Sequence, residues 1–139
     1  MDDEYSIATI ILGDGVRACV LTRSGEDDFL TDLASTGKTR NRAVLIARMA
    51  ARVARNGTDW AVAAKKLKPV SRDVSMFELR IDRRVIRVMA YIHDDPAHTP
   101  VYLFDFDGHQ GKSGKIDRNL IKKGERLAAI AAKCMEVRK

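Results

Sequence analysis

The sequence predicts an α+β domain: a twisted, mainly antiparallel sheet with two N-terminal helices on one face, followed by a C-terminal helix. Three segments, 77–82, 85–92 and 101–106, have the composition of strands, and the first alternates between apolar and charged residues. Two others, 40–56 and 118–135, carry apolar residues at helical spacing. Because the alternation leaves one sheet face polar, helices need to cover only the other face.

Two short apolar runs open the chain. Residues 7–12 and 16–22 flank Gly13-Asp14-Gly15, a sequence typical of a tight hairpin turn between strands. We interpret residues 1–15 as an N-terminal extension of a single domain that spans residues 1–139, since a chain of this length normally forms one core.

The two predicted helices follow this hairpin. Acidic residues precede Phe29 and favour a short helix from about residue 27 to residue 35, because carboxylates stabilise a first helical turn. Residues 40–56 are rich in alanine and stop at Gly57, which is typical of a helix end. The apolar stripe of this second helix consists of Val44, Leu45, Met49 and Val53.

The strand over residues 77–82 defines two faces of the sheet. Side chains alternate along a strand, so Arg80 falls on the face opposite Phe77, Leu79 and Ile81. The sheet is therefore expected to have one apolar face for the core and one charged face for a partner.

The charge of the chain is unevenly distributed. The net charge is +6, and residues 65–139 hold 17 Lys and Arg against 10 Asp and Glu, whereas residues 1–64 hold 8 against 9. A basic half favours a polyanionic partner, of which nucleic acid is the commonest, although a basic surface that serves only solubility has the same composition.

Cysteine usage and hydropathy indicate a cytoplasmic protein with no membrane partner. Cys19 and Cys134 are too far apart to form a metal motif or a disulfide framework, which suits a reducing compartment. The acidic N-terminus lacks the basic start of a signal peptide, and no apolar run approaches the roughly 18 residues that span a bilayer.

Two further motifs do not establish a binding site for a cofactor or a metal. Gly111-Lys112-Ser113 follows a strand and precedes a helix, but the first glycine of a phosphate-binding loop would fall at Phe106. Asp105, Asp107 and His109 alternate and suit either a metal site or a solvated strand face, and their spacing does not select a metal. We therefore predict no metal and no cofactor.

A cluster of basic residues is more informative. It lies in and before the first two of the three strands and consists of Lys65, Lys66, Lys68, Arg72, Arg80, Arg83, Arg84 and Arg87. RNA cleavage through the 2′-hydroxyl needs one group to accept a proton, one to stabilise the developing charge and one to protonate the leaving oxygen. Arginine and lysine suit the charge-stabilising role, and His109 or Tyr91 suits proton transfer. Ordinary surface salt bridges would explain the same cluster.

Residues 16–135 resemble the RelE/ParE superfamily of bacterial toxins, especially its HigB-like and phage-derived branch. Leu67 followed by Phe77-Glu78-Leu79-Arg80 is similar to the family's leucine, spacer and aromatic-Glu-Leu-Arg segment. Ile86-Arg87-Val88 and Leu103-Phe104-Asp105-Phe106 are similar to its next two strands. The order of elements is also similar, and a RelE-like fold is expected.

Members of that superfamily are typically ribosome-dependent mRNA endonucleases neutralised by a small antitoxin, whereas the ParE branch poisons gyrase. Together with the basic cluster, the resemblance implies a set of catalytic residues, namely Arg80, Arg87, Tyr91 and His109. The residues expected to contact nucleic acid are Lys66, Lys68, Arg83 and Lys112.

The function that the resemblance implies is that of the toxin of a type II toxin–antitoxin system. It would cleave mRNA on the ribosome by metal-independent 2′-hydroxyl attack, with mRNA, the ribosome and an antitoxin as partners and a homodimer or a hetero-oligomer as its assembly. The chain departs from the family pattern at Ala90, where a tyrosine is expected, and at Lys112, which comes late. Two alternatives therefore stay open: a catalytically inactive module that binds nucleic acid or a protein, and a gyrase-directed toxin.

Overall fold

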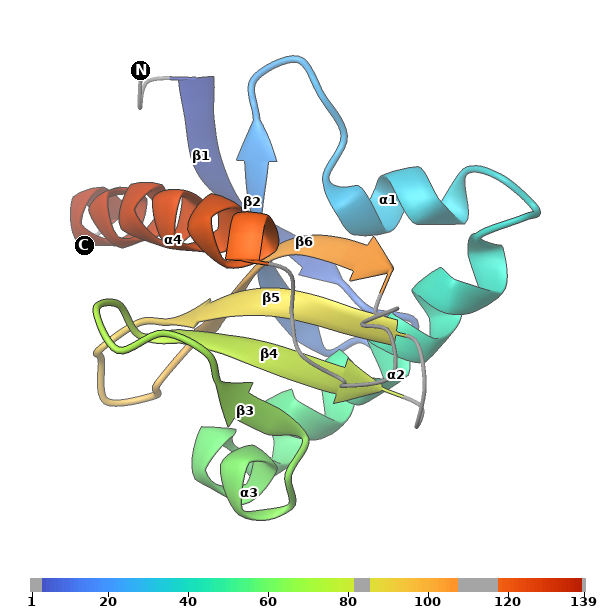
Figure 1. The fold of residues 1–139 in the computed structure, drawn as a ribbon. Helices are drawn as coiled ribbons and strands as arrows, with labels where there is room; N and C mark the ends of the chain where they lie inside the picture. Colours follow the sequence, from blue (N-terminus) through green and yellow to red (C-terminus); the bar gives the residue numbers. More distant parts are fainter. Residues whose placement is uncertain (1–3, 82–85, 108–117, 139) are drawn as a thin grey trace.

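The computed structural model describes residues 4–81, 86–107 and 118–138, and within them the chain is α+β, as predicted (Figure 1). The elements in chain order are β1 (Tyr5–Ile11), β2 (Arg17–Arg23), α1 (Phe29–Ala34), α2 (Arg40–Asn56), α3 (Thr58–Ala63), β3 (Leu67–Pro69), β4 (Met76–Ile81), β5 (Ile86–Ile92), β6 (Pro100–Asp107) and α4 (Arg118–Arg138).

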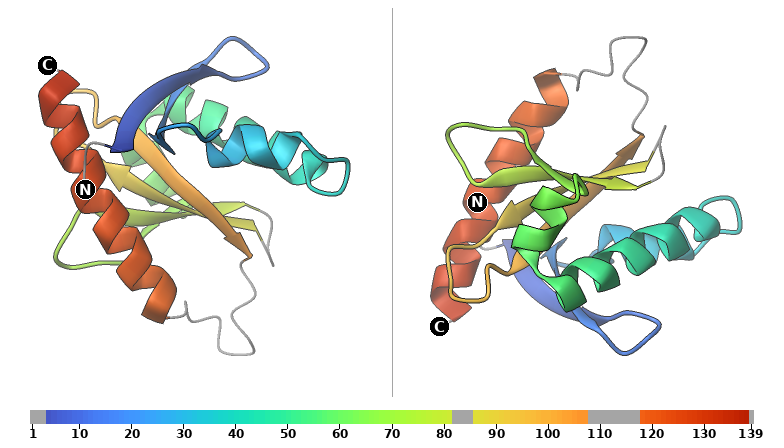
Figure 2. Two further views of the ribbon diagram at one scale, coloured as in Figure 1. Left: turned by 90° about the horizontal axis from the view of Figure 1, so that it is seen from above. Right: turned by 90° about the horizontal axis from the view of Figure 1, so that it is seen from below.

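The six strands form one sheet in the order β1-β2-β6-β5-β4-β3. Neighbouring strands are antiparallel except β2 and β6, which run parallel and pair Cys19 with Val101 and Val20 with Tyr102. The prediction of a mainly antiparallel sheet is confirmed. The direction of the strands turns visibly from β1 to β4, so the sheet is twisted (Figures 1 and 2).

The expectation of two N-terminal helices is wrong, because strands come first. The hairpin of β1 and β2 precedes every described helix, and three helices rather than two lie between it and β3. The physical reason is that β2 pairs with β6, so the hairpin adds two strands to the sheet. The strand pattern of residues 7–12 and 16–22 was visible in the sequence, but their pairing with a strand about 80 positions later is a long-range contact that no local pattern reports.

The ends of the helices follow local signals. Asp28 caps α1, because its Oδ1 accepts hydrogen bonds from the backbone nitrogens of Leu30 and Thr31 at 3.0 and 2.9 Å. Gly57 ends α2 at a φ of 93°, a conformation that glycine adopts without strain. Within the described ranges, neither α4 nor any shorter helix has the length and apolar character needed to cross a bilayer.

Helices cover both faces of the sheet. On one face, here called the α2-side face, α2 packs through Ile46, Met49 and Val53 on strand residues that include Leu79, Val88 and Ala90. On the other, the α4-side face, α4 packs through Leu127, Ala128 and Ala131 on residues that include Met76, Met89 and Val101. Figure 2 shows α2 and α4 on opposite sides of the strands.

The prediction that one sheet face stays polar and uncovered is therefore wrong. Arg80 does lie opposite Leu79, as alternation requires, but the face that carries Arg80 is apolar where α4 crosses it. Met76 and Met89 are completely buried there. The charged residues of this face, Glu78, Arg80 and Arg87, follow Met76 along β4 and precede Met89 along β5.

Gly124 allows α4 to approach β4 closely. A Cβ atom at this position would lie 2.6 Å from the Sδ atom and 3.3 Å from the Cε atom of Met76. Met76 is fully buried, so its side chain has little room to move aside. The absence of a side chain at Gly124 thus sets the distance between helix and sheet.

We expect Gly124→Ala to lower the free energy of unfolding by about 1 kcal/mol, as measured by urea denaturation. Overpacking a filled core costs roughly 1–3 kcal/mol, and replacing glycine by alanine inside a helix returns roughly 1 kcal/mol. Met76→Ala should make room for the added methyl group. The loss of unfolding free energy in the double variant should therefore be about 1 kcal/mol smaller than the sum of the losses in the two single variants. If the two losses simply add, the close approach of Gly124 to Met76 is contradicted.

Candidate nucleic-acid interface

Two arginines face each other across the strands β4 and β5. Arg80 and Arg87 are direct partners in the antiparallel register, and Glu78 lies two residues before Arg80 on the same face. Like charges directly opposite one another destabilise a sheet unless a counter-charge lies between them. Glu78 supplies that counter-charge.

The carboxylate of Glu78 contacts both guanidinium groups. Its Oε1 lies 3.2 Å from the Nε of Arg80, and its Oε2 lies 3.7 Å from Nη1 of Arg87. The side chains of Glu78 and Arg87 are only 2% and 10% exposed, whereas that of Arg80 is 42% exposed. Glu78 and Arg87 thus form a buried ion pair, and the contact with Glu78 orients Arg80, whose side chain reaches the surface.

The edge strand β3 and the residue before it bring two lysines beside this cluster. Lys68 is the register partner of Glu78, and the backbone nitrogen of Arg80 donates to the carbonyl oxygen of Lys66 at 2.8 Å. Lys68 is exposed, and Lys66 is half-buried. We call Lys66, Lys68 and Arg80 the basic face. Lys68 and Arg80 lie on adjacent strands, and Lys66 directly precedes β3.

Lys123 of α4 brings another positive charge to the α4-side face. Its ammonium nitrogen lies 4.4 Å from the centre of the Phe104 ring, a cation–π contact. Sequence reasoning did not single out Lys123 or Glu78. Alternation alone placed Glu78 on the charged face, but only the register shows that it lies between two arginines.

Tyr91 lies away from this cluster. It occurs four residues after Arg87 on β5, which corresponds to about 13 Å along a strand. Its hydroxyl group lies 3.2 Å from Nδ1 of the buried His93. Burial raises the pKa of the Tyr91 phenol, and the carboxylates of Glu136, Asp94 and Asp95 raise it further. Tyr91 therefore stays protonated at neutral pH, and the structure does not bring it to the arginines.

Asp105 lies on the α2-side face, because it is the register partner of Val88. Its Oδ2 forms an ion pair with Nε of Arg42 at 3.0 Å, and its side chain is 7% exposed. This pairing explains the residue as part of the contact between α2 and the sheet. No group of three potential metal ligands occurs among the residues that the structure describes.

Three expected site residues, Arg83, His109 and Lys112, lie outside the described residues. The described part of the interface consists of two exposed or half-buried lysines and one oriented arginine. Such a set can bind phosphate groups, since Arg80 offers a planar fork and the lysines act as point charges.

Comparison with known proteins found no family model that matches this chain, and no curated protein and no solved structure that is similar to it.

Proposed function

We propose that this protein binds RNA through the basic face. The observation that carries the proposal is the register of β3, β4 and β5, which gathers Lys66, Lys68 and Arg80 on one surface while Glu78 and Arg87 orient Arg80 from below. Arginine and lysine contacts to phosphates supply most of the affinity of such surfaces. The basic C-terminal half of the chain supports the same partner.

We further propose that the bound RNA is mRNA, and that the protein cleaves it as the toxin of a toxin–antitoxin pair does. The 2′-oxygen would attack the adjacent phosphorus, the bond to the 5′-oxygen would break, and the 2′-proton would pass to the leaving oxygen. The product is a cyclic phosphate, which water can open to a 3′-phosphate. Arg80 would stabilise the charge that develops on the phosphate oxygens, and His109 would transfer the proton. Support for this step comes from the resemblance in residues 67–106 and from the exposed, oriented guanidinium of Arg80.

Expression in a bacterium that lacks the neighbouring gene tests the proposed cleavage. We expect growth to stop and mRNA to be fragmented, as judged by primer extension. Growth arrest with whole mRNA and stalled replication would indicate a gyrase-directed toxin instead. Undiminished growth with intact mRNA would contradict the toxin proposal altogether.

A second candidate function is an RNA-binding module without catalysis. The observation that favours it is the position of Tyr91, which contacts His93 at the far end of β5 and is remote from Arg80. Substituting His109 separates the two functions. Cleavage should fall steeply in His109→Ala if the protein is a catalyst, whereas RNA affinity should change little in either case.

We expect the affinity for single-stranded RNA to fall steeply with salt. If about four basic residues contact phosphates, the logarithm of the binding constant should fall with the logarithm of salt concentration at a slope of roughly −3. Filter binding at several salt concentrations measures this slope. Replacing Lys68 or Arg80 with alanine should flatten it by somewhat less than one unit, whatever the RNA sequence.

Arg52→Ala is the matched control for this measurement. The guanidinium of Arg52 lies 5.3 Å from the centre of the Trp60 ring, and α2 lies on the opposite side of the sheet from the basic face. Its removal changes the net charge as much as the removal of Arg80 does. Equal losses from Arg52→Ala and Arg80→Ala, or an affinity independent of salt, would exclude the basic face as the RNA site.

A further inference from the structure

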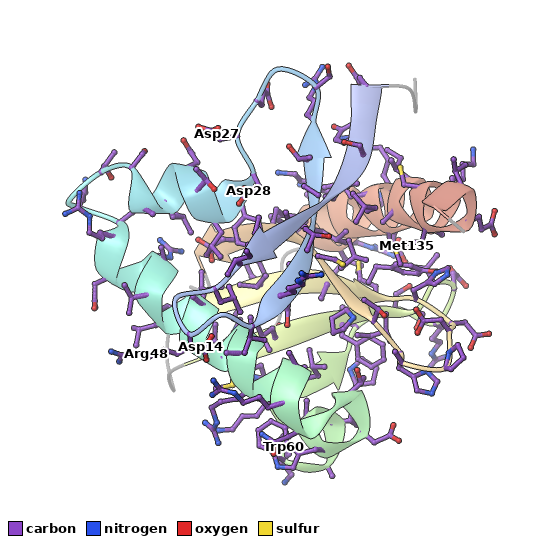
Figure 3. All side chains as sticks on the ribbon, turned by 180° about the vertical axis from the view of Figure 1, so that it is seen from behind. Asp14, Asp27, Asp28, Arg48, Trp60 and Met135 are labelled. Atoms are coloured by element: carbon purple, nitrogen blue, oxygen red, sulfur yellow. The ribbon has the colours of Figure 1, made fainter. Side chains whose placement is uncertain are left out.

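An apolar groove lies on the other side of the molecule from the basic face. It is bounded by the tip of the β1–β2 hairpin, by α1 and by α2, and its volume is about 490 Å³. Figure 3 shows Asp14 at the hairpin tip beside Arg48 of α2. Apolar side chains dominate the lining, among them Ile11, Leu30 and Val44.

Two exposed hydrophobic residues meet at this groove. Ile11 is 72% exposed and Val44 is 39% exposed, and they are two of the four large hydrophobic residues that are exposed in the described part of the chain. An apolar patch of this kind, rimmed by charges, is typical of an interaction site. The other two such residues, Val62 and Val137, do not line the groove.

One stripe of α2 lines the groove, and its residues are Arg40, Ala43, Val44, Ala47, Arg48 and Ala51. Their spacing of three and four residues places them on one side of the helix over about 16 Å, or three turns. Ala43 and Ala51 are buried and Ala47 between them is half-buried, so a second helix can approach α2 closely at Ala47. The length and shape of the groove therefore suit a helix of a few turns.

The rim of the groove carries positive charge. Arg40 and Arg48 both lie on it, and neither forms an ion pair with any residue in the described ranges. Asp14, the acidic residue on the rim, is neutralised by an ion pair with Arg55. A partner with carboxylates beside its apolar face would complement these charges.

We propose that this groove binds an amphipathic helix of a partner protein, with apolar residues such as leucine and alanine on its inner face and Asp or Glu on its flanks. The apolar face would cover Ile11 and Val44, and the carboxylates would pair with Arg40 and Arg48. The proposal does not depend on RNA binding, because the groove and the basic face lie on opposite sides of the sheet.

Three fluorescent helical peptides of about 18 residues test the proposal by fluorescence anisotropy. They share leucine and alanine at helical spacing and differ only in their flanking residues, which are glutamate, serine or lysine. The glutamate peptide should bind about tenfold more tightly than the serine peptide, and the lysine peptide should bind most weakly. The absence of binding by the glutamate peptide, or equal binding of all three, would overturn the proposal.

Variants locate the binding on the protein. Val44→Asp and Ile11→Asp should each weaken binding of the glutamate peptide about tenfold or more. Val62→Asp, which is matched to Val44→Asp in exposure and also lies on a helix, should not. Arg48→Ala should weaken it, whereas Arg72→Ala, an exposed residue outside the groove, should leave it unchanged. All of these residues are exposed, so the variants should fold. If Val44→Asp does not fold, Val44→Ser takes its place in the experiment. Equal effects of Val44→Asp and Val62→Asp on peptide binding would overturn the proposal. A dimer of this chain that Val44→Asp dissociates would also overturn it, because a second copy would then occupy the groove.

Discussion

Replacing Glu78 with alanine should lower the free energy of unfolding by about 3–5 kcal/mol. Glu78 is the carboxylate that both Arg80 and Arg87 contact, and it is almost completely buried. Arg87 is also buried, so without Glu78 its charge would lie opposite that of Arg80 in a medium that screens it poorly. Urea denaturation followed by circular dichroism would measure the loss.

Arg80→Ala is the control for this prediction. The side chain of Arg80 is 42% exposed, and Arg87 still contacts Glu78 after its removal. The expected loss is therefore that of a partly exposed ion pair, about 1 kcal/mol or less. If Glu78→Ala and Arg80→Ala destabilise the protein equally, the buried carboxylate does not have the supporting role assigned to it.

Arg80→Ala should lower the rate of mRNA cleavage by roughly 10²–10³-fold, the effect of removing one group that stabilises charge in a transition state. The exposed guanidinium of Arg80 is oriented by Glu78 and is the group best placed to contact a phosphate among the described residues of the basic face. Because this substitution should cost little stability, unfolding would not explain a loss of cleavage. Single-turnover cleavage of ribosome-bound mRNA would measure the rate.

Arg80→Lys and Arg52→Ala complete this experiment. Lysine keeps the charge but loses the planar fork, so Arg80→Lys should recover only part of the activity. Arg52→Ala should cleave at the wild-type rate, because Arg52 lies against Trp60 on the other side of the sheet. Wild-type cleavage by Arg80→Ala would contradict the assigned role, and RNA binding without cleavage by the unaltered protein would favour the binding module.

The sequence by itself determined most of the elements and the face on which each strand residue lies. Residues 40–56 form α2 with the bounds that their alanine content and Gly57 predicted. Arg80 and Leu79 lie on different faces of the sheet, because the side chains of any strand alternate between its two faces. These properties depend on near neighbours in the chain, so they can be inferred from local patterns.

Only the tertiary structure decided which elements meet. The covering of both sheet faces depends on where α4 docks, and Gly124 permits that docking by leaving room for Met76. The contact of the buried Glu78 with Arg87 follows from the register of β4 against β5. The groove arises where the hairpin tip comes to lie against α2. Each of these arrangements joins different elements of the fold, and the free energy that selects them comes from packing and charge pairing between elements, which the composition of a single segment does not contain.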